Sequence, residues 1–293
     1  MGIAPEQKRR PADVLHGFFL LCHPGPVLLH VLAVTVFALL AANPHFVWST
    51  IVLVVAAHTA MQLSIAVLND YCDRRRDMQS KKHKPIPLGL VRPREALYTG
   101  ILLMVLMIVL LLPLPPLALL ISLLYLAFGQ GYNLGLKSTP LSGIVFALAI
   151  PLIPVYAFVG VGRILPLVFW LVPVAALLGV ALNLANSLPD IQEDTLNHAR
   201  TLAVVLGVRN TFMVSALLLF LSALLVGLLA LTRLVQAQLW ILLPTLLIVC
   251  VLVGVLIFAF GPQKPLQTRK TYFYLVVCTC LLLAGGWLTS ALI

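Results

Sequence analysis

The sequence predicts an all-α integral membrane protein with nine transmembrane helices. Of its 293 residues, 61% are hydrophobic and only 10% are charged, and the mean hydropathy is +1.08, whereas soluble domains carry about a quarter charged residues. The apolar residues gather in runs of roughly 20, the length that spans a bilayer as a helix. Only a helix or a closed barrel satisfies its own backbone in lipid. We therefore expect a single membrane domain over residues 1–293.

The nine apolar runs are separated by polar or proline-rich junctions such as "LPLPP". They lie at residues 26–42, 46–68, 96–112, 115–132, 141–160, 164–187, 211–231, 239–260 and 272–292. An odd number of spans places the two termini on opposite sides of the membrane.

Basic residues are sorted unevenly between those two sides. If the N-terminal segment 1–25 is cytoplasmic, 17 of the 19 Lys and Arg fall on the cytoplasmic side, and only Arg163 and Arg233 fall on the other. The positive-inside rule then predicts a cytoplasmic N-terminus. A missed span would scramble the sorting, so the same bias supports nine spans. We expect a multi-pass protein of a bacterial or archaeal plasma membrane.

The remaining composition excludes other classes of protein. The net charge of +10 fits anchoring against anionic lipid and gives no indication of nucleic acid binding. The five cysteines lie in or beside apolar segments without the spacing of a zinc site, and a packing role is favoured.

All nine acidic residues fall on the predicted cytoplasmic side, and seven of them lie in two loops. In the first loop, "NDYCDRRRD", Asp70, Asp73 and Asp77 are spaced i, i+3 and i+7. If the second span continues as a helix, the three carboxylates line one face.

The second loop, "NLANSLPDIQEDTLNHARTLAVVLG", repeats this pattern with Asn183, Asn186, Asp190 and Asp194. We expect these four residues to share one face of the sixth span, with a kink at Pro189. Two solvated helix ends could also explain such acids, but two matched clusters make that interpretation weaker.

Like charges on one helix face repel, so a cation is expected between them. Oxygen ligands without His or Cys suit Mg²⁺, which proteins often hold together with substrate phosphate oxygens. Four basic residues near the acids would complete a site for an anion such as a diphosphate. They are Lys82, Lys84, Lys137 and Arg200.

Three segments resemble the UbiA superfamily of intramembrane prenyltransferases. "NDYCDRRRD" with the following "KPIPLG" is similar to its first motif, and "NSLPDIQEDTLNHARTLAVVLG" is similar to its second. "YNLGLKS" resembles the loop after the fourth helix, with Tyr132 and Lys137 matching. Departures from the family pattern are Lys84 for a common Arg, His198 for Gly, and His23 near the first helix.

The resemblance implies a helix bundle around a central cavity, two Mg²⁺ ions, a polyprenyl diphosphate donor and a hydrophobic, typically aromatic, acceptor. The five motif aspartates would be catalytic, and Tyr132 would join the four basic residues at the diphosphate. By position, one ion would be held by Asn69, Asp70, Asp73 and Asp77, and the other by Asn186, Asp190 and Asp194.

Two alternatives remain open from the sequence. A terpene cyclase of the same family would ionise the same diphosphate and trap the cation with an internal alkene. A cation transporter would also use acidic residues, although transporter sites usually lie near the bilayer midplane rather than at helix ends. Within the second span, His58 and Gln62 favour a buried hydrogen bond over a place on the cavity floor.

The charge sorting makes a prediction about topology. In a cysteine-free background, a single cysteine in the Arg74–Lys84 loop should react with an impermeant thiol reagent only from the cytoplasmic side, and one beside Arg163 only from outside. Labelling of both positions from one side would contradict nine spans.

Overall fold

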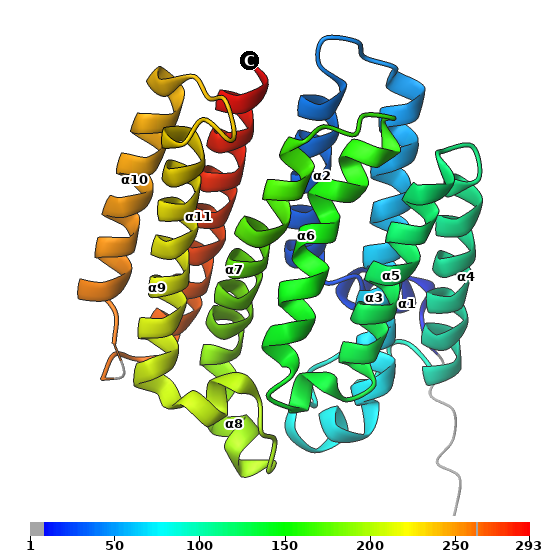
Figure 1. The fold of residues 1–293 in the computed structure, drawn as a ribbon. Coiled ribbons are helices and arrows are strands. Elements are labelled where there is room, and N and C mark those ends of the chain that lie inside the picture. The colour runs from blue at the N-terminus through cyan, green and yellow to red at the C-terminus, as the bar shows by residue number, and fades with distance from the viewer. Residues whose placement is uncertain (1–8, 262) are drawn as a thin grey trace, which may run out of the picture.

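The computed structural model describes residues 9–261 and 263–293 as helices joined by turns, with no strand in that part of the chain. Figure 1 shows the long helices side by side in one bundle, with α9, α10 and α11 on one flank, α3, α4 and α5 on the other, and α2, α6 and α7 between them. The long helices are α2 (Pro24–Ala42), α3 (Trp48–Ser80), α4 (Pro93–Leu111), α5 (Pro116–Asn133), α6 (Ser142–Gly160), α7 (Leu167–Ser187), α9 (Leu202–Leu231), α10 (Leu239–Phe258) and α11 (Leu266–Leu292). The short elements are α1 (Pro11–Leu21), α8 (Ile191–Leu196) and the single 3₁₀ turns η1 (Leu136–Ser138) and η2 (Leu188–Asp190).

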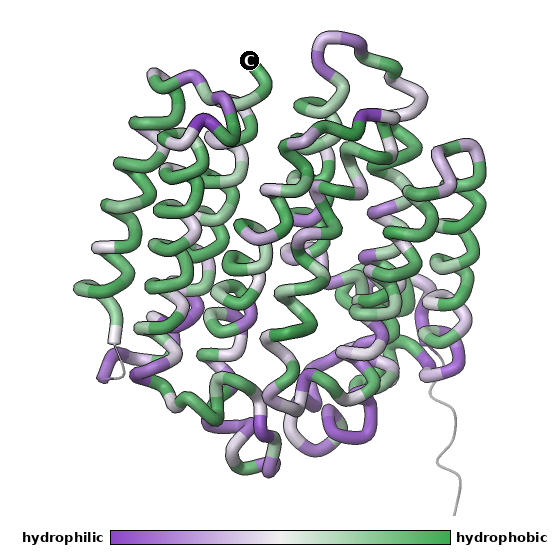
Figure 2. The backbone as a smooth tube through the Cα atoms, viewed as in Figure 1, coloured by the Kyte–Doolittle hydropathy of each residue, from purple (hydrophilic) through white to green (hydrophobic). Residues whose placement is uncertain are grey.

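Eight helices in the described ranges are long and apolar enough to cross a membrane. The remaining predicted span, 115–132, forms the helix α5 but is not among the eight, since its last turn carries the polar Gln130, Tyr132 and Asn133. Hydrophilic residues gather at the two ends of the bundle, and the helix middles are hydrophobic (Figure 2). The fold is therefore that of a multi-pass membrane protein with eight candidate spans, and the ninth stays a prediction.

Helix α3 carries the first acidic motif out of the apolar core. It has 33 residues and is about 50 Å long at 1.5 Å per residue, so its last turns extend beyond its apolar part. The expectation that this span continues as a helix through Asp77 is confirmed. Asp70 and Asp77 are nevertheless buried, with 2% and 3% of their surface exposed.

The second motif does not form one continuous helical face. Helix α7 ends at Ser187, and the chain makes the 3₁₀ turn η2, which contains Pro189, before α8 begins. A 3₁₀ turn has three residues per turn rather than 3.6, so it rotates the later side chains relative to the earlier ones. Asn183 is fully buried and accepts a hydrogen bond from Ser142, whereas Asp190 is exposed. The predicted common face is therefore wrong for Asn183.

Helices α6 and α7 approach each other closely at Gly179. A Cβ atom at this position would lie 2.4 Å from the carbonyl oxygen of Phe146, a distance at which the backbone would have to move. Glycine is needed here because it has no side chain to separate the two helices. This contact sets the distance between α6 and α7 at the centre of the bundle.

We expect Gly179→Ala to destabilise the protein by about 1–3 kcal/mol, the usual effect of overpacking a core. Gly254→Ala in α10 is the matched control, because a Cβ atom there would meet nothing within 4 Å. Thermal unfolding in detergent should show a lower midpoint for the first variant only. Equal midpoints would contradict the close approach.

Candidate functional site

The first acidic cluster is closed by Lys84. Its Nζ donates hydrogen bonds to Asp70 Oδ1 at 2.9 Å and to Asp77 Oδ2 at 2.8 Å. The turn after α3 folds the chain back and so places Lys84 against two carboxylates that precede it. On the other side of the cluster, His23 Nε2 lies 3.1 Å from Asp70 Oδ1.

The environment of Lys84 favours its charged form. Burial alone would lower the pKa of the ammonium group, but the carboxylates of Asp70 and Asp77 outweigh this and raise the pKa above its ordinary value. A raised pKa means that the stabilisation by these pairs is fully present at neutral pH. It is lost only in the alkaline range, as the pH rises through the pKa of Lys84 in the folded protein.

Lys137 closes the remaining part of the first motif. It lies in η1, and its Nζ donates to Asp73 Oδ2 at 2.5 Å and to Asn69 Oδ1 at 2.9 Å. The motif residues Asn69, Asp70, Asp73 and Asp77 are thus all bound by a lysine. The side chain of Lys137 is only 15% exposed, so it packs into the site rather than standing free in a loop.

Basic residues at the end of α3 and just after it also reach the second cluster. Arg76 Nη2 lies 3.0 Å from Asp194 Oδ1, and Lys81 Nζ lies 4.0 Å from Asp190 Oδ1 and 3.8 Å from Glu193. The two acidic clusters therefore face each other across a row of cations. Arg76 and Lys81 are site residues that the sequence analysis missed, although both stand beside the first motif.

Two of the predicted basic residues lie apart from these pairs. Lys82 and Arg200 are exposed, and neither side chain makes a hydrogen bond or ion pair to a described residue. The backbone N–H of Arg200 donates to the carbonyl of Ser138 at 2.9 Å. This bond holds the end of the second motif against η1, next to Lys137.

Two adjoining cavities open below the acidic clusters. The first, about 250 Å³, lies between α2, α3, α5 and α6, and its wall includes Asn69 and Tyr132 at the charged end. The second, about 360 Å³, lies between α2, α6, α7 and α11, and its wall includes Asn186. The shared wall residues are Pro26, His30, Phe146 and Ile150.

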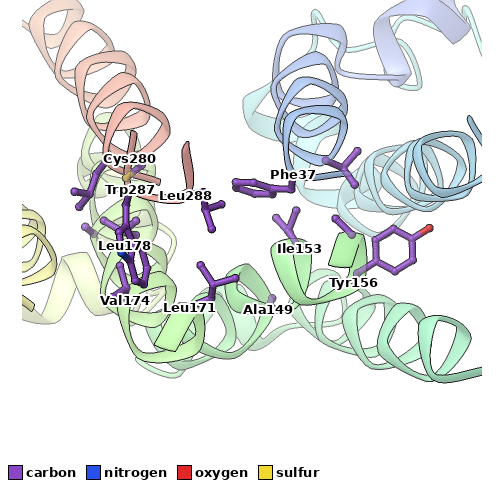
Figure 3. Packing of buried hydrophobic residues seen from close by; sticks show 14 of the residues in the cluster. Phe37, Ala149, Ile153, Tyr156, Leu171, Val174, Leu178, Cys280, Trp287 and Leu288 are labelled. Carbon is purple, nitrogen blue, oxygen red and sulfur yellow. The ribbon is translucent and has the colours of Figure 1, made fainter. Parts of the chain in front are cut away.

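The second cavity is mainly hydrocarbon. Figure 3 shows Phe37 of α2, Leu171 of α7 and Leu288 of α11 directed toward one another across the bundle centre. Such a wall offers an apolar chain the same environment as lipid. A molecule with an anionic head and a hydrocarbon tail would match both the cation row and this cavity.

The donor atoms of the site suit a hard metal ion in kind. The first motif offers three carboxylates and one amide oxygen, and the second offers Asn186, Asp190 and Asp194, without His or Cys. No ready-made metal site of three or more His, Cys, Asp or Glu side chains occurs in the described ranges. The carboxylates are instead paired with ammonium and guanidinium groups, so a metal would require Lys84 and Lys137 to turn away.

Lys84 and Lys82 make a matched pair for measuring these contacts. We expect Lys84→Met to lower the free energy of unfolding by about 1–3 kcal/mol, because it removes a hydrogen bond from each of the buried carboxylates Asp70 and Asp77. Lys82→Met should change it by less than about 0.5 kcal/mol, as exposed substitutions usually do. Unfolding in mixed detergent at pH 7 measures both, and similar losses would contradict the buried bridge.

Known proteins resemble the chain in both sequence and fold. A digeranylgeranylglyceryl phosphate synthase of Pyrococcus abyssi is 32% identical over 151 residues, which are 51% of this chain and 54% of that protein. A 4-hydroxybenzoate octaprenyltransferase of Salmonella paratyphi B is 30% identical over 195 residues, 65% of this chain and 67% of that protein. The chain spans about half the length of the archaeal relatives that it matches.

Solved structures share the whole architecture. A structure of digeranylgeranylglyceryl phosphate synthase superposes with a TM-score of 0.73 at 17% identity, covering 96% of this chain and 99% of the other. A UbiA homologue of Archaeoglobus fulgidus bound to DMAPP and Mg²⁺ superposes with a TM-score of 0.68 at 16% identity, covering 92% and 99%. Residues 30–291 match the sequence profile of the UbiA prenyltransferase family. With nearly all of its helical bundle inside that match, the chain belongs to the UbiA prenyltransferase family.

Proposed function

We propose that this protein transfers a polyprenyl group from a polyprenyl diphosphate to a hydrophobic, aromatic acceptor in a Mg²⁺-dependent reaction. The observation that carries the proposal is the pair of acidic clusters facing each other across Lys84, Lys137, Arg76 and Lys81, directly above two cavities. Family membership and the names of the relatives support the same reaction class. The diphosphate belongs at the charged rim and the prenyl tail in the apolar cavity.

The oxygen ligands would hold two metal ions. Asn69, Asp70, Asp73 and Asp77 would bind one ion, and Asn186, Asp190 and Asp194 the other. When bound, Mg²⁺ supplies positive charge against the departing diphosphate, which lowers the barrier to breaking its bond to carbon. A UbiA homologue of Archaeoglobus fulgidus bound to DMAPP and Mg²⁺ supports the use of Mg²⁺ in the proposal.

The basic residues would change partners when the donor binds. Lys84 and Lys137, released from the carboxylates, would donate hydrogen bonds to diphosphate oxygens, with Tyr132, Lys82 and Arg200 at the same rim. The allylic C–O bond then breaks with its electron pair leaving on the diphosphate. The allylic cation bonds to a carbon of the acceptor ring through C1, and the ring loses a proton.

The second cavity would hold the prenyl tail and keep water from the cation. Its wall is mainly aliphatic and aromatic, with side chains such as Phe37, Leu171 and Leu288. The same cavity could fold a donor for internal cyclisation. Analysis of the product, with and without acceptor, separates a terpene cyclase from a transferase.

The orientation that we propose places the N-terminus and both acidic motifs in the cytoplasm, with nine spans. Arg163, predicted outside, donates to the carbonyls of Ala41 and Asn43 at the end of α2. That end of the bundle lies opposite the acidic clusters in Figure 1. The arrangement agrees with the sorting of basic residues along the sequence.

Charge removal at single metal ligands should abolish turnover without removing the fold. We expect Asp70→Asn and Asp190→Asn each to lower kcat for diphosphate release by about 10²–10³, the usual loss when one preorganised electrostatic contact is removed. Asp13→Asn on the exposed side of α1 is the control and should keep full activity. The assay uses purified protein in detergent with C10 to C20 prenyl diphosphates, Mg²⁺ and aromatic acceptors.

Detergent solution also separates enzyme from transporter, because no gradient exists there. Diphosphate release that requires Mg²⁺ and stops with EDTA supports the enzyme. If no donor is ionised while Mg²⁺ still binds in an Asp70-dependent way, the cation transporter becomes the better interpretation.

A further inference from the structure

A cluster of neutral polar side chains lies inside the bundle, away from the acidic motifs. It contains His30 from α2, His58 and Gln62 from α3, and Tyr125 from α5. The ring of His58 lies 5.9 Å from that of His30 and 5.7 Å from that of Tyr125, measured between centroids. Three of the four, His30, Gln62 and Tyr125, line the first cavity.

Hydrogen bonds within the protein satisfy this cluster only in part. Gln62 Nε2 lies 3.2 Å from His58 Nε2, so the amide donates to that ring nitrogen and the proton of a neutral His58 resides on Nδ1. The Nδ1 atoms of His58 and His30 are buried, and no described group bonds to either. Buried polar atoms without partners are costly, and the side chain of His30, which lines the first cavity, suits a ligand hydroxyl that can donate to it.

The cavity wall also limits the charge of such a ligand. Within the described part of the chain, neither cavity is lined by a Lys, Arg, Asp or Glu side chain. The polar His23 at the rim is already engaged by Asp70. A carboxylate buried in this cavity would find no cation, and an isolated buried charge is strongly unfavourable.

The size and depth of the cavity fit a single ring. His30 follows His23 on α2 by two helical turns, about 10 Å along the axis, so the cluster lies well below the charged rim. A cavity of about 150 Å³ is enough for benzene, and this one measures about 250 Å³. A ring with its hydroxyl at the cluster would turn its opposite edge toward the rim.

We propose that the first cavity seats the acceptor of the reaction, an uncharged aromatic ring whose hydroxyl group bonds to His30. The inference rests on the proposed function only in calling this ring the acceptor. The donor tail then occupies the second cavity, and His30, on the shared wall, lies between the two substrates. His30 acts as a specificity-determining residue that selects the hydroxyl.

Three probes test the site directly by calorimetry with the full-length protein in detergent, without Mg²⁺ or donor. They are methyl 4-hydroxybenzoate, methyl benzoate, which lacks only the hydroxyl, and 4-hydroxybenzoate, which carries a carboxylate. Titration into bare micelles corrects for partition into detergent. We expect the hydroxylated ester to bind about tenfold more tightly than methyl benzoate, the usual value of one buried hydrogen bond, and more tightly than the carboxylate.

Variants assign that preference to the cluster. His30→Leu should reduce the ratio between the two esters to near one, and His30→Gln should restore part of it. Tyr272→Phe is the control, because it removes a buried polar group outside both cavities, a hydroxyl bonded to Phe212 and Ser215. Its ratio should equal that of the wild type.

The proposal is overturned if the wild type binds both esters equally, if it prefers the carboxylate, or if His30→Leu keeps the full ratio. A thermal midpoint for each variant identifies a folding defect, and His30→Gln decides the outcome if His30→Leu unfolds. If the binding test fails but the protein still releases diphosphate in an Asp70-dependent way, only the proposed acceptor site is wrong. If the hydroxylated ester binds as expected but no diphosphate is released, the proposed function is wrong and a binding site for neutral phenols remains.

Discussion

Asp70 and Asp77 are carboxylates buried at the mouth of a hydrocarbon bundle, and the structure around them depends on neutralising that charge. A buried carboxylate is tolerated only when it is paired and hydrogen-bonded. Lys84, in the turn after α3, pairs with both Asp70 and Asp77. Lys137 of η1 pairs with Asp73, and Arg76 pairs with Asp194 of the second cluster. The turn after α3, η1 and α8 are thereby held against the end of α3.

The same pairing bears on how the proposed substrates would bind. Lys84 bonds to Asp70 and Asp77, and Lys137 bonds to Asp73, so each lysine is paired with carboxylates that are proposed to bind metal. Arrival of a metal and a diphosphate together would replace each ion pair by two new ones, carboxylate to metal and ammonium to phosphate.

The helical repeat of Asp70, Asp73 and Asp77 is local, and it predicted both the extension of α3 and the place of the first cluster. The second motif was less predictable, because the 3₁₀ turn at Pro189 changes the register and directs Asn183 into the core. Contacts between remote residues had no local signal at all. His23 and Asp70 are 47 residues apart, and Arg76 and Asp194 are 118 apart, so only the packed bundle brings them together.

The distribution of charge between rim and cavities matters for a reaction that passes through an allylic cation. A lysine or arginine on the cavity wall would raise the energy of that cation, and a carboxylate would capture it as an ester. The described walls of both cavities avoid the two hazards, while every charged group of the site stays at the rim beside the leaving group. Imidazole nitrogen is itself a nucleophile, but His30 lies about 10 Å below His23 along α2. That depth places His30 well below the rim at which the diphosphate would lie in the proposed reaction.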